Sequence, residues 1–144
     1  MTGRRTAGDD GSVLVLTLGL AAVVVLVVGV VVNVSAVVLA KRAVASAADG
    51  AALTAVQALD VPALYAGGIQ DALPISEADA AARVEAYRQA TEPSLPGLRM
   101  TVRVEGAEAV VEAVRTVRPP FPVLGTGPVE VRSVARARAP VVIP

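Results

Sequence analysis

The sequence contains no cysteine and no histidine, and these absences exclude several kinds of chemistry. Without cysteine the chain has no disulfide framework, no thiol nucleophile and no thiolate metal ligand. Without histidine it lacks the commonest general base and the commonest metal ligand. Glu105, Glu108 and Glu112 are close in sequence, but neither an acid–base partner nor a metal-ligand spacing accompanies them. We therefore expect a non-enzymatic protein, with no catalytic residues, no metal site and no cofactor.

Aromatic residues are also scarce, because the chain has only Tyr65, Tyr87 and Phe121. The 13 basic and 13 acidic side chains give a formal net charge of zero. Nucleic-acid binding usually needs a basic patch, and often aromatic side chains on which bases stack. Gly67-Gly68 and Gly125-Thr126-Gly127 lack the strand–loop–helix setting of a phosphate site. The pattern favours neither a nucleic acid nor a small molecule as partner.

What the chain does have is a long apolar run, because residues 11–40 carry no charged side chain. As a helix this run is about 45 Å long, whereas the hydrocarbon core of a bilayer is about 30 Å thick. It is also longer than the apolar region of a cleaved signal peptide. We predict an N-terminal tail over 1–11 and a transmembrane helix over 12–40, surrounded by membrane lipid. Charge alone does not orient this span, because Arg4 and Arg5 flank one end and Lys41 and Arg42 the other.

The helix is predicted to continue beyond the membrane. Residues 41–60 are rich in alanine, leucine and glutamine, and no proline precedes Pro62. We expect one helix from about Ser12 to about Leu59, which Gly50 weakens without ending. Small residues recur along it at three- and four-residue steps, as they do on membrane helices that pack closely. They are Gly29, Asn33, Ala36, Ala40, Ala43, Ala47 and Ala51.

This stripe of small residues has two interpretations. It is a packing surface for another helix, or it follows simply from the high frequency of alanine. Asn33 is open in the same way, since its amide either bonds to a neighbouring helix or meets water near the outer interface.

Residues 61–144 have the pattern of a small αβ domain. A loop with prolines leads to Ser76, whose hydroxyl is predicted to cap a helix over 77–91. Alternating apolar and polar residues predict three strands, at 98–105, 109–117 and 129–138. We expect an antiparallel meander covered by the 77–91 helix, which gives an α+β fold with a pilin-like plan. The arginines of the last strand are interpreted as the solvent face of an edge strand, in preference to a patch for anionic lipid or a partner.

Short motifs flank the apolar run on both sides. Gly11-Ser12 precedes it, Lys41-Arg42 follows it, and Ala47-Ala48-Asp49-Gly50-Ala51-Ala52-Leu53 comes next. This order resembles the TadE/TadG-like proteins of tight-adherence (Flp) pilus assembly. Residues 131–139 are similar to the alanine-rich strand that often ends those domains. The resemblance implies a single-pass protein of the bacterial cytoplasmic membrane, with 1–11 in the cytoplasm and both the 41–60 continuation and the 61–144 domain outside.

The resemblance also implies partners, namely the Tad secretion ATPase, the platform proteins and pilin subunits. The helix is expected to pack against such Tad-system membrane proteins or pilin. The residues expected to do so are Gly29, Asn33, Ala36, Ala40, Asp49 and Leu53. Asp49 lies just beyond the span, where it pairs with a basic group of a neighbouring helix or stays solvated.

One feature of processed pseudopilins is missing. They typically carry Glu at the fifth position after a glycine cleavage point, but that position is Leu16 counted from Gly11 and Val13 counted from Gly8. We therefore expect a helix that stays in the membrane. The alternative function is an exported or membrane-tethered binding or adaptor domain unrelated to pili, which cleavage near Ala45 or Ala47 would release.

Overall fold

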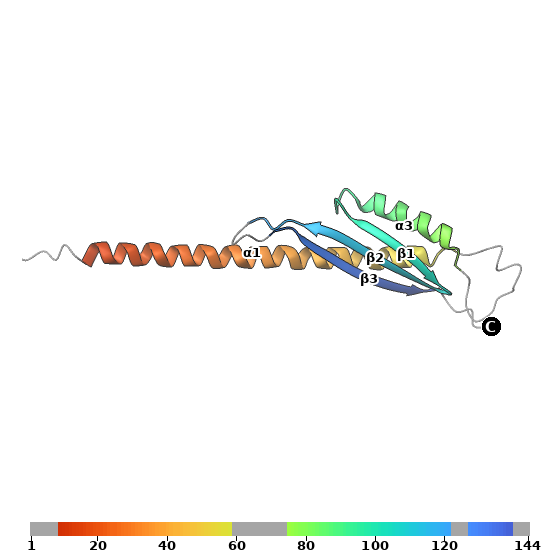
Figure 1. Ribbon diagram of the computed structural model, residues 1–144, viewed down its shortest axis with the longest axis horizontal. Helices are drawn as coiled ribbons and strands as arrows, with labels where there is room; N and C mark the ends of the chain where they lie inside the picture. Colours follow the sequence, from red (N-terminus) through yellow and green to blue (C-terminus); the bar gives the residue numbers. More distant parts are fainter. Residues whose placement is uncertain (1–8, 59–74, 122–126, 140–144) are drawn as a thin grey trace, which may run out of the picture.

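A computed structural model describes residues 9–58, 75–121 and 127–139 of the chain. Within these residues the chain forms two helices and a three-stranded sheet (Figure 1). The helices are α1 (Asp9–Ala55) and α3 (Glu77–Thr91), and the strands are β1 (Arg99–Glu105), β2 (Glu108–Val117) and β3 (Val129–Arg138). The predicted α+β plan is confirmed. The predicted loop over 61–74 lies outside the described residues.

Helix α1 is one continuous helix of 47 residues. It contains no proline, and few side chains in its apolar part can compete for backbone hydrogen bonds, namely those of Ser12, Thr17, Asn33 and Ser35. Thr17 donates to the Val13 carbonyl, one turn back, at 2.8 Å. The helix ends at Ala55 rather than at about Leu59, and a short turn follows it. The chain later returns to this end, where the Ser76 N–H donates to the Ala58 carbonyl at 2.9 Å.

Helix α3 has the predicted bounds, and its first turn explains where it starts. The Ser76 hydroxyl accepts a hydrogen bond from the Asp79 N–H at 3.3 Å, as an N-cap does. Glu77 and Asp79 place negative charge at the positive end of the helix dipole. At the other end, the Glu92 N–H donates to the Arg88 carbonyl.

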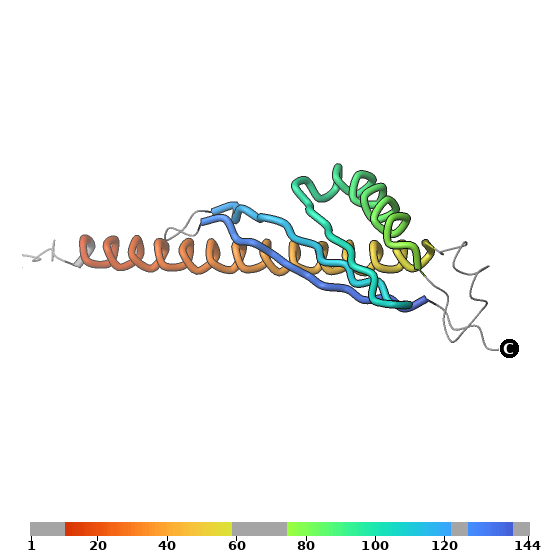
Figure 2. Tube along the Cα trace, turned by 45° about the vertical axis from the view of Figure 1, so that its right-hand side comes forward, coloured from red at the N-terminus to blue at the C-terminus, as the bar shows by residue number. Residues whose placement is uncertain are grey.

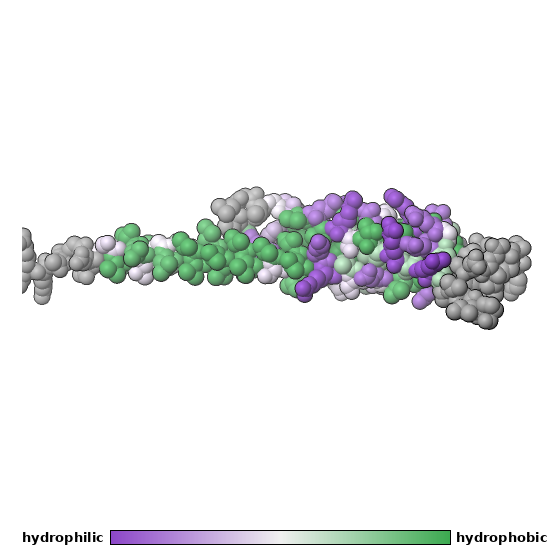
Figure 3. All heavy atoms as spheres, turned by 90° about the horizontal axis from the view of Figure 1, so that it is seen from below, coloured by the Kyte–Doolittle hydropathy of each residue, from purple (hydrophilic) through white to green (hydrophobic). Residues whose placement is uncertain are grey.

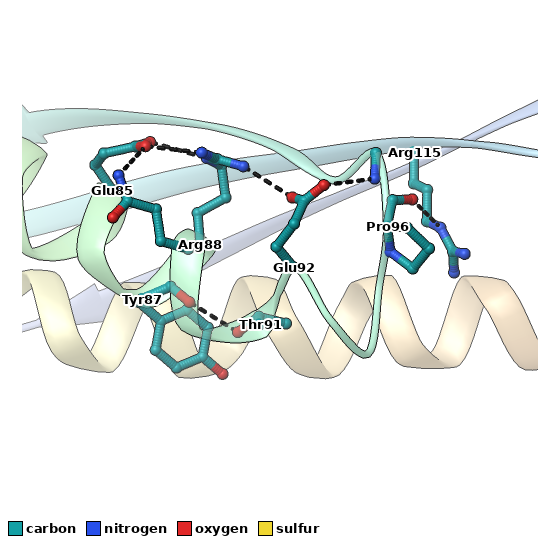
Figure 4. A network of polar contacts seen from close by, with 9 residues as sticks. Glu85, Tyr87, Arg88, Thr91, Glu92, Pro96 and Arg115 are labelled. Carbon is teal, nitrogen blue, oxygen red and sulfur yellow. Dashed lines mark hydrogen bonds and ion pairs between the residues drawn. The ribbon is translucent and has the colours of Figure 1, made fainter.

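The C-terminal end of α3 is tied to the connection that leads into β1 (Figure 4). Arg88 forms ion pairs with Glu85 at 2.8 Å and with Glu92 at 2.9 Å. The other carboxylate oxygen of Glu92 accepts from the Gly97 N–H at 3.1 Å. Gly97 has a φ of 76°, a conformation in which glycine is favoured. These contacts fix the angle at which the chain leaves α3.

The sheet is the predicted antiparallel meander, with strand order β1-β2-β3. The register places Val102 opposite Val111, and Val111 opposite Ala135. The turn between β1 and β2 contains Gly106, whose φ is 65°. The alternating pattern that predicted the strands therefore sets which side chains face inward.

The inner face of the sheet is covered mainly by the C-terminal part of α1, along which the strands lie (Figures 1 and 2). Helix α3 contacts β1 and α1 instead. The prediction that the 77–91 helix covers the meander was therefore right only at the β1 edge. Helix α1 covers most of the sheet because its side chains there are small. Its alanines meet alanines and valines of the sheet, so the helix and the strands can approach closely. The buried strand residues are Ala109, Val111, Ala113, Val131 and Ala135.

The outer face of the sheet carries charged side chains that pair across strands. Arg132 lies 2.9 Å from Glu112, and Arg136 lies 3.9 Å from Glu108. All four side chains are at least a quarter exposed, so each pair contributes little stability. The pairing favours the interpretation of the β3 arginines as a solvent face.

Candidate functional site: the two halves of helix α1

The first half of α1 is apolar and touches almost nothing else in the chain. Its large side chains from Val13 to Val32 are exposed, and Figure 3 shows them as a continuous hydrophobic surface beside a more hydrophilic domain. The helix is long and apolar enough to cross a membrane, and none of its most apolar window is buried. A soluble protein does not normally leave so large an apolar surface in water. By length and composition, this half is a candidate membrane span.

A pair of hydrogen bonds marks the end of this exposed half. The Asn33 side-chain amide donates to the Phe121 carbonyl, and the Phe121 N–H donates to Asn33 Oδ1 at 3.0 Å. We call this pairing the Asn33–Phe121 clamp. Asn33 is only 9% exposed, the one buried polar side chain among the described residues. Its amide is thus hydrogen-bonded within its own chain. Neither interpretation from the sequence, a bond to a neighbouring helix or contact with water, describes this pairing.

The second half of α1 is packed against the domain on one side only. Its buried side consists of small residues with exposures of 5% or less, which are Val44, Ala47, Ala48, Ala51, Ala52 and Ala55. Asp49 and Leu53 lie on the opposite side, one turn apart, and both are exposed. No ion pair of Asp49 occurs within the described part of the chain. The Ala-Ala-Asp motif therefore has a side used inside the chain and a side left free.

Gly50 lies on α1 where Tyr87 of α3 comes against it. A Cβ atom at this position would be 2.2 Å from Tyr87 Oη and 2.8 Å from Tyr87 Cζ, far inside contact distance. Tyr87 is partly buried and packs against the core. Glycine at position 50 thus makes room for the tyrosine ring, which is a packing role in addition to its low helix propensity.

The geometry can be compared with known proteins. Residues 11–58 match the family model of Flp pilus-assembly TadE/G-like proteins. Helix α1 is therefore similar to this family. The match begins near the N-terminus of α1 and ends just beyond its C-terminus, so it covers both halves of the helix. The TadE/G-like resemblance seen in the sequence is confirmed over these residues. No curated protein and no solved structure matches the chain.

The predicted packing residues differ in exposure, because Asp49 and Leu53 are exposed and the other four are not. Gly29, Ala36 and Ala40 are partly buried, and Asn33 is buried by its own chain. The flanking residues Lys41 and Arg42 are exposed, whereas Arg4 and Arg5 lie outside the described residues.

Two contacts of helix α1 were not predicted from the sequence, those with Phe121 and Tyr87. Each joins positions far apart in the chain, and neither leaves a local pattern. The predicted stripe is therefore not one continuous free surface.

Within the described ranges, no group of three acidic side chains could hold a metal ion. Glu108 and Glu112 are used in the ion pairs on the outer face of the sheet. Helix α1 presents an apolar surface along its first half and a mixed surface along the exposed side of its second half.

Proposed function

We propose that the protein is a single-span, non-enzymatic envelope component of a Tad/Flp-type pilus assembly or related secretion apparatus. Helix α1 anchors it in the cytoplasmic membrane, and the αβ domain stands outside. The observation that carries the proposal is the TadE/G-like match over residues 11–58 on a helix whose first half exposes its large apolar side chains. An exposed apolar helix joined rigidly to a folded domain fits an anchor better than a segment that is removed.

The partner surface is proposed to be the free side of the second half of α1. Asp49 and Leu53 lie there together, on the side opposite the buried alanines. Leu53 is 61% exposed, although leucine gains by burial. Another Tad-system membrane protein or a pilin subunit would cover Leu53 and offer a basic group to Asp49. Packing of this kind leaves the fold of the domain unchanged.

The proposal is tested by deletion and complementation in cells that make the pilus. Deletion of the gene should abolish surface pili, and the wild-type gene should restore them. Leu53→Arg should fail to restore them although the protein accumulates in the membrane fraction. Val134→Arg is the matched control, because Val134 is 53% exposed but lies on the outer face of the sheet. Normal pili in the deletion strain would contradict the proposal.

Topology and anchoring need a separate measurement. A reporter that is active only in the periplasm, fused after Pro144, should be active, with residues 1–11 in the cytoplasm. Alkaline extraction should leave the full-length protein in the membrane. A mature N-terminus at Ser46 or Ala48, found by N-terminal sequencing, would instead support the exported adaptor domain.

A further inference from the structure

The Asn33–Phe121 clamp lies at a definite height on α1. Asp9 and Asp10 bound the apolar run below, and the helix from residue 11 to residue 32 rises about 33 Å at about 1.5 Å per residue. The hydrocarbon core of a bilayer is about 30 Å thick. The apolar run up to residue 40 is about 45 Å long, so about 15 Å of it must lie outside the hydrocarbon. Length alone does not say at which end.

The clamp indicates that the excess length lies at the C-terminal end of the apolar run, because it brings irregular backbone against the helix there. The segment Arg118–Phe121 follows β2 and belongs to neither a helix nor a strand. Such backbone cannot face hydrocarbon, where unpaired carbonyl and N–H groups have no water to bind. If residues 12–40 spanned the bilayer, Phe121 would be held well inside the hydrocarbon by Asn33. The clamp therefore has to lie at or above the edge of the hydrocarbon core.

The same segment suits that edge. Pro119 and Pro120 have no N–H groups, and the N–H and carbonyl of Phe121 are both paired with Asn33. The Phe121 ring is 48% exposed. It lines an open groove together with side chains on the N-terminal side of the clamp, among them Val25, Val28 and Val32. The ring thus borders the surface that would lie in lipid.

We propose that the Asn33–Phe121 clamp marks the level at which α1 leaves the hydrocarbon, and that Phe121 contacts lipid at the boundary between acyl chains and headgroups. This rests on the proposed membrane anchoring of α1. The span then runs over residues 11–32, and two turns of apolar helix above it are outside the hydrocarbon. Lys41 is about 12 Å above Asn33, which places it beyond the headgroup layer, about 5 to 8 Å thick on each side of the bilayer. The clamp also fixes the domain close to the membrane surface.

The sequence allows a clean depth measurement, because the chain has no tryptophan. Three single-tryptophan variants of the full chain are reconstituted in phosphatidylcholine vesicles that carry a nitroxide either near the glycerol backbone or near the end of the acyl chain. The variants are Phe121→Trp, Val23→Trp and Val134→Trp, at positions that are all about half exposed.

Each variant has a distinct expected loss of fluorescence. Trp in Phe121→Trp should be quenched more by the shallow nitroxide than by the deep one. Val23→Trp should show the reverse order, and Val134→Trp should be quenched by neither. Adding Asn33→Leu to Phe121→Trp should weaken the shallow quenching, whereas Ser35→Ala should leave it unchanged.

Two results would overturn the proposal. Deep quenching of Phe121→Trp would place the clamp inside the hydrocarbon. An unquenched Phe121→Trp beside a deeply quenched Val23→Trp would mean that α1 spans the membrane but that water or a second copy of the chain covers Phe121. If Val23→Trp is also unquenched, the anchoring itself fails, so the two failures are distinguishable.

Discussion

Replacing Gly50 by alanine tests whether α1 and α3 really meet as closely as the structure shows. In an open helix, Gly→Ala stabilises by about 1 kcal/mol. Here the new Cβ would lie 2.2 Å from Tyr87 Oη and 2.8 Å from Cζ, so the ring must move. Overpacking of this kind costs about 1 to 3 kcal/mol. The two effects combine to a net destabilisation of about 0 to 2 kcal/mol for Gly50→Ala.

A double-mutant cycle separates these two effects. Tyr87→Ala removes the ring, so adding Gly50→Ala to it should stabilise the protein by about 1 kcal/mol. The coupling between the two substitutions should equal the steric cost, about 1 to 3 kcal/mol. The assay is hydrogen exchange of the β2 amides in detergent micelles, which reports opening of the domain independently of the apolar first half of α1.

Gly19→Ala is the control for this cycle, because no atom lies within 4 Å of a Cβ built at Gly19. It should leave exchange in β2 unchanged. If Gly50→Ala has the same effect with and without Tyr87, the close approach of the two helices is refuted.

Three other perturbations have definite outcomes. Leu98→Ala should destabilise the domain by about 2 to 5 kcal/mol in urea unfolding, because Leu98 is only 2% exposed; a loss below about 1 kcal/mol would argue against its place in the core. Asn33→Ala should speed hydrogen exchange at the Phe121 amide and leave the β2 amides protected. Unchanged exchange at Phe121 would mean that the clamp does not hold Phe121 against α1. Hydrogen bonds from Arg88 lower the pKa of Glu85 from 4.5 to about 2, so stability from this carboxylate is present above pH 4.5 and is lost as the pH falls toward 2. Arg88→Met should make the free energy of unfolding depend less on pH between about 4.5 and 2. An unchanged pH dependence would contradict the pairing of Glu85 with Arg88.

The elements that could be predicted from the sequence are those with a local signal. The absence of charge over residues 11–40 predicted the helix, Ser76 predicted the start of α3, and alternation predicted the meander. It was harder to predict which helix covers the sheet, because alanines are so frequent in α1 that the sequence does not indicate which side of the helix is buried. Only the fold shows that Ala48 and Ala51 are buried while Asp49 is free.

The clamp and the Gly50–Tyr87 contact had no signal in the sequence. Asn33 and Phe121 are 88 positions apart, and an asparagine in an apolar run is equally compatible with several partners. Glycine in a helix looks like a local weakness, and its use becomes visible only when Tyr87 is seen against it. Both contacts depend on how closely other parts of the chain pack against α1, and this is set by the tertiary structure rather than by a local pattern.

The central claim is that α1 joins this protein to other components of a Tad-type apparatus. The most direct test is site-specific photo-crosslinking in cells, with the photoreactive residue at Leu53 and, as control, at Val134. From Leu53 we predict a crosslinked product that contains a Tad-system membrane protein or pilin and that disappears when the Tad genes are deleted. An identical pattern from Val134, or a Leu53 product that persists without the Tad genes, would contradict the account.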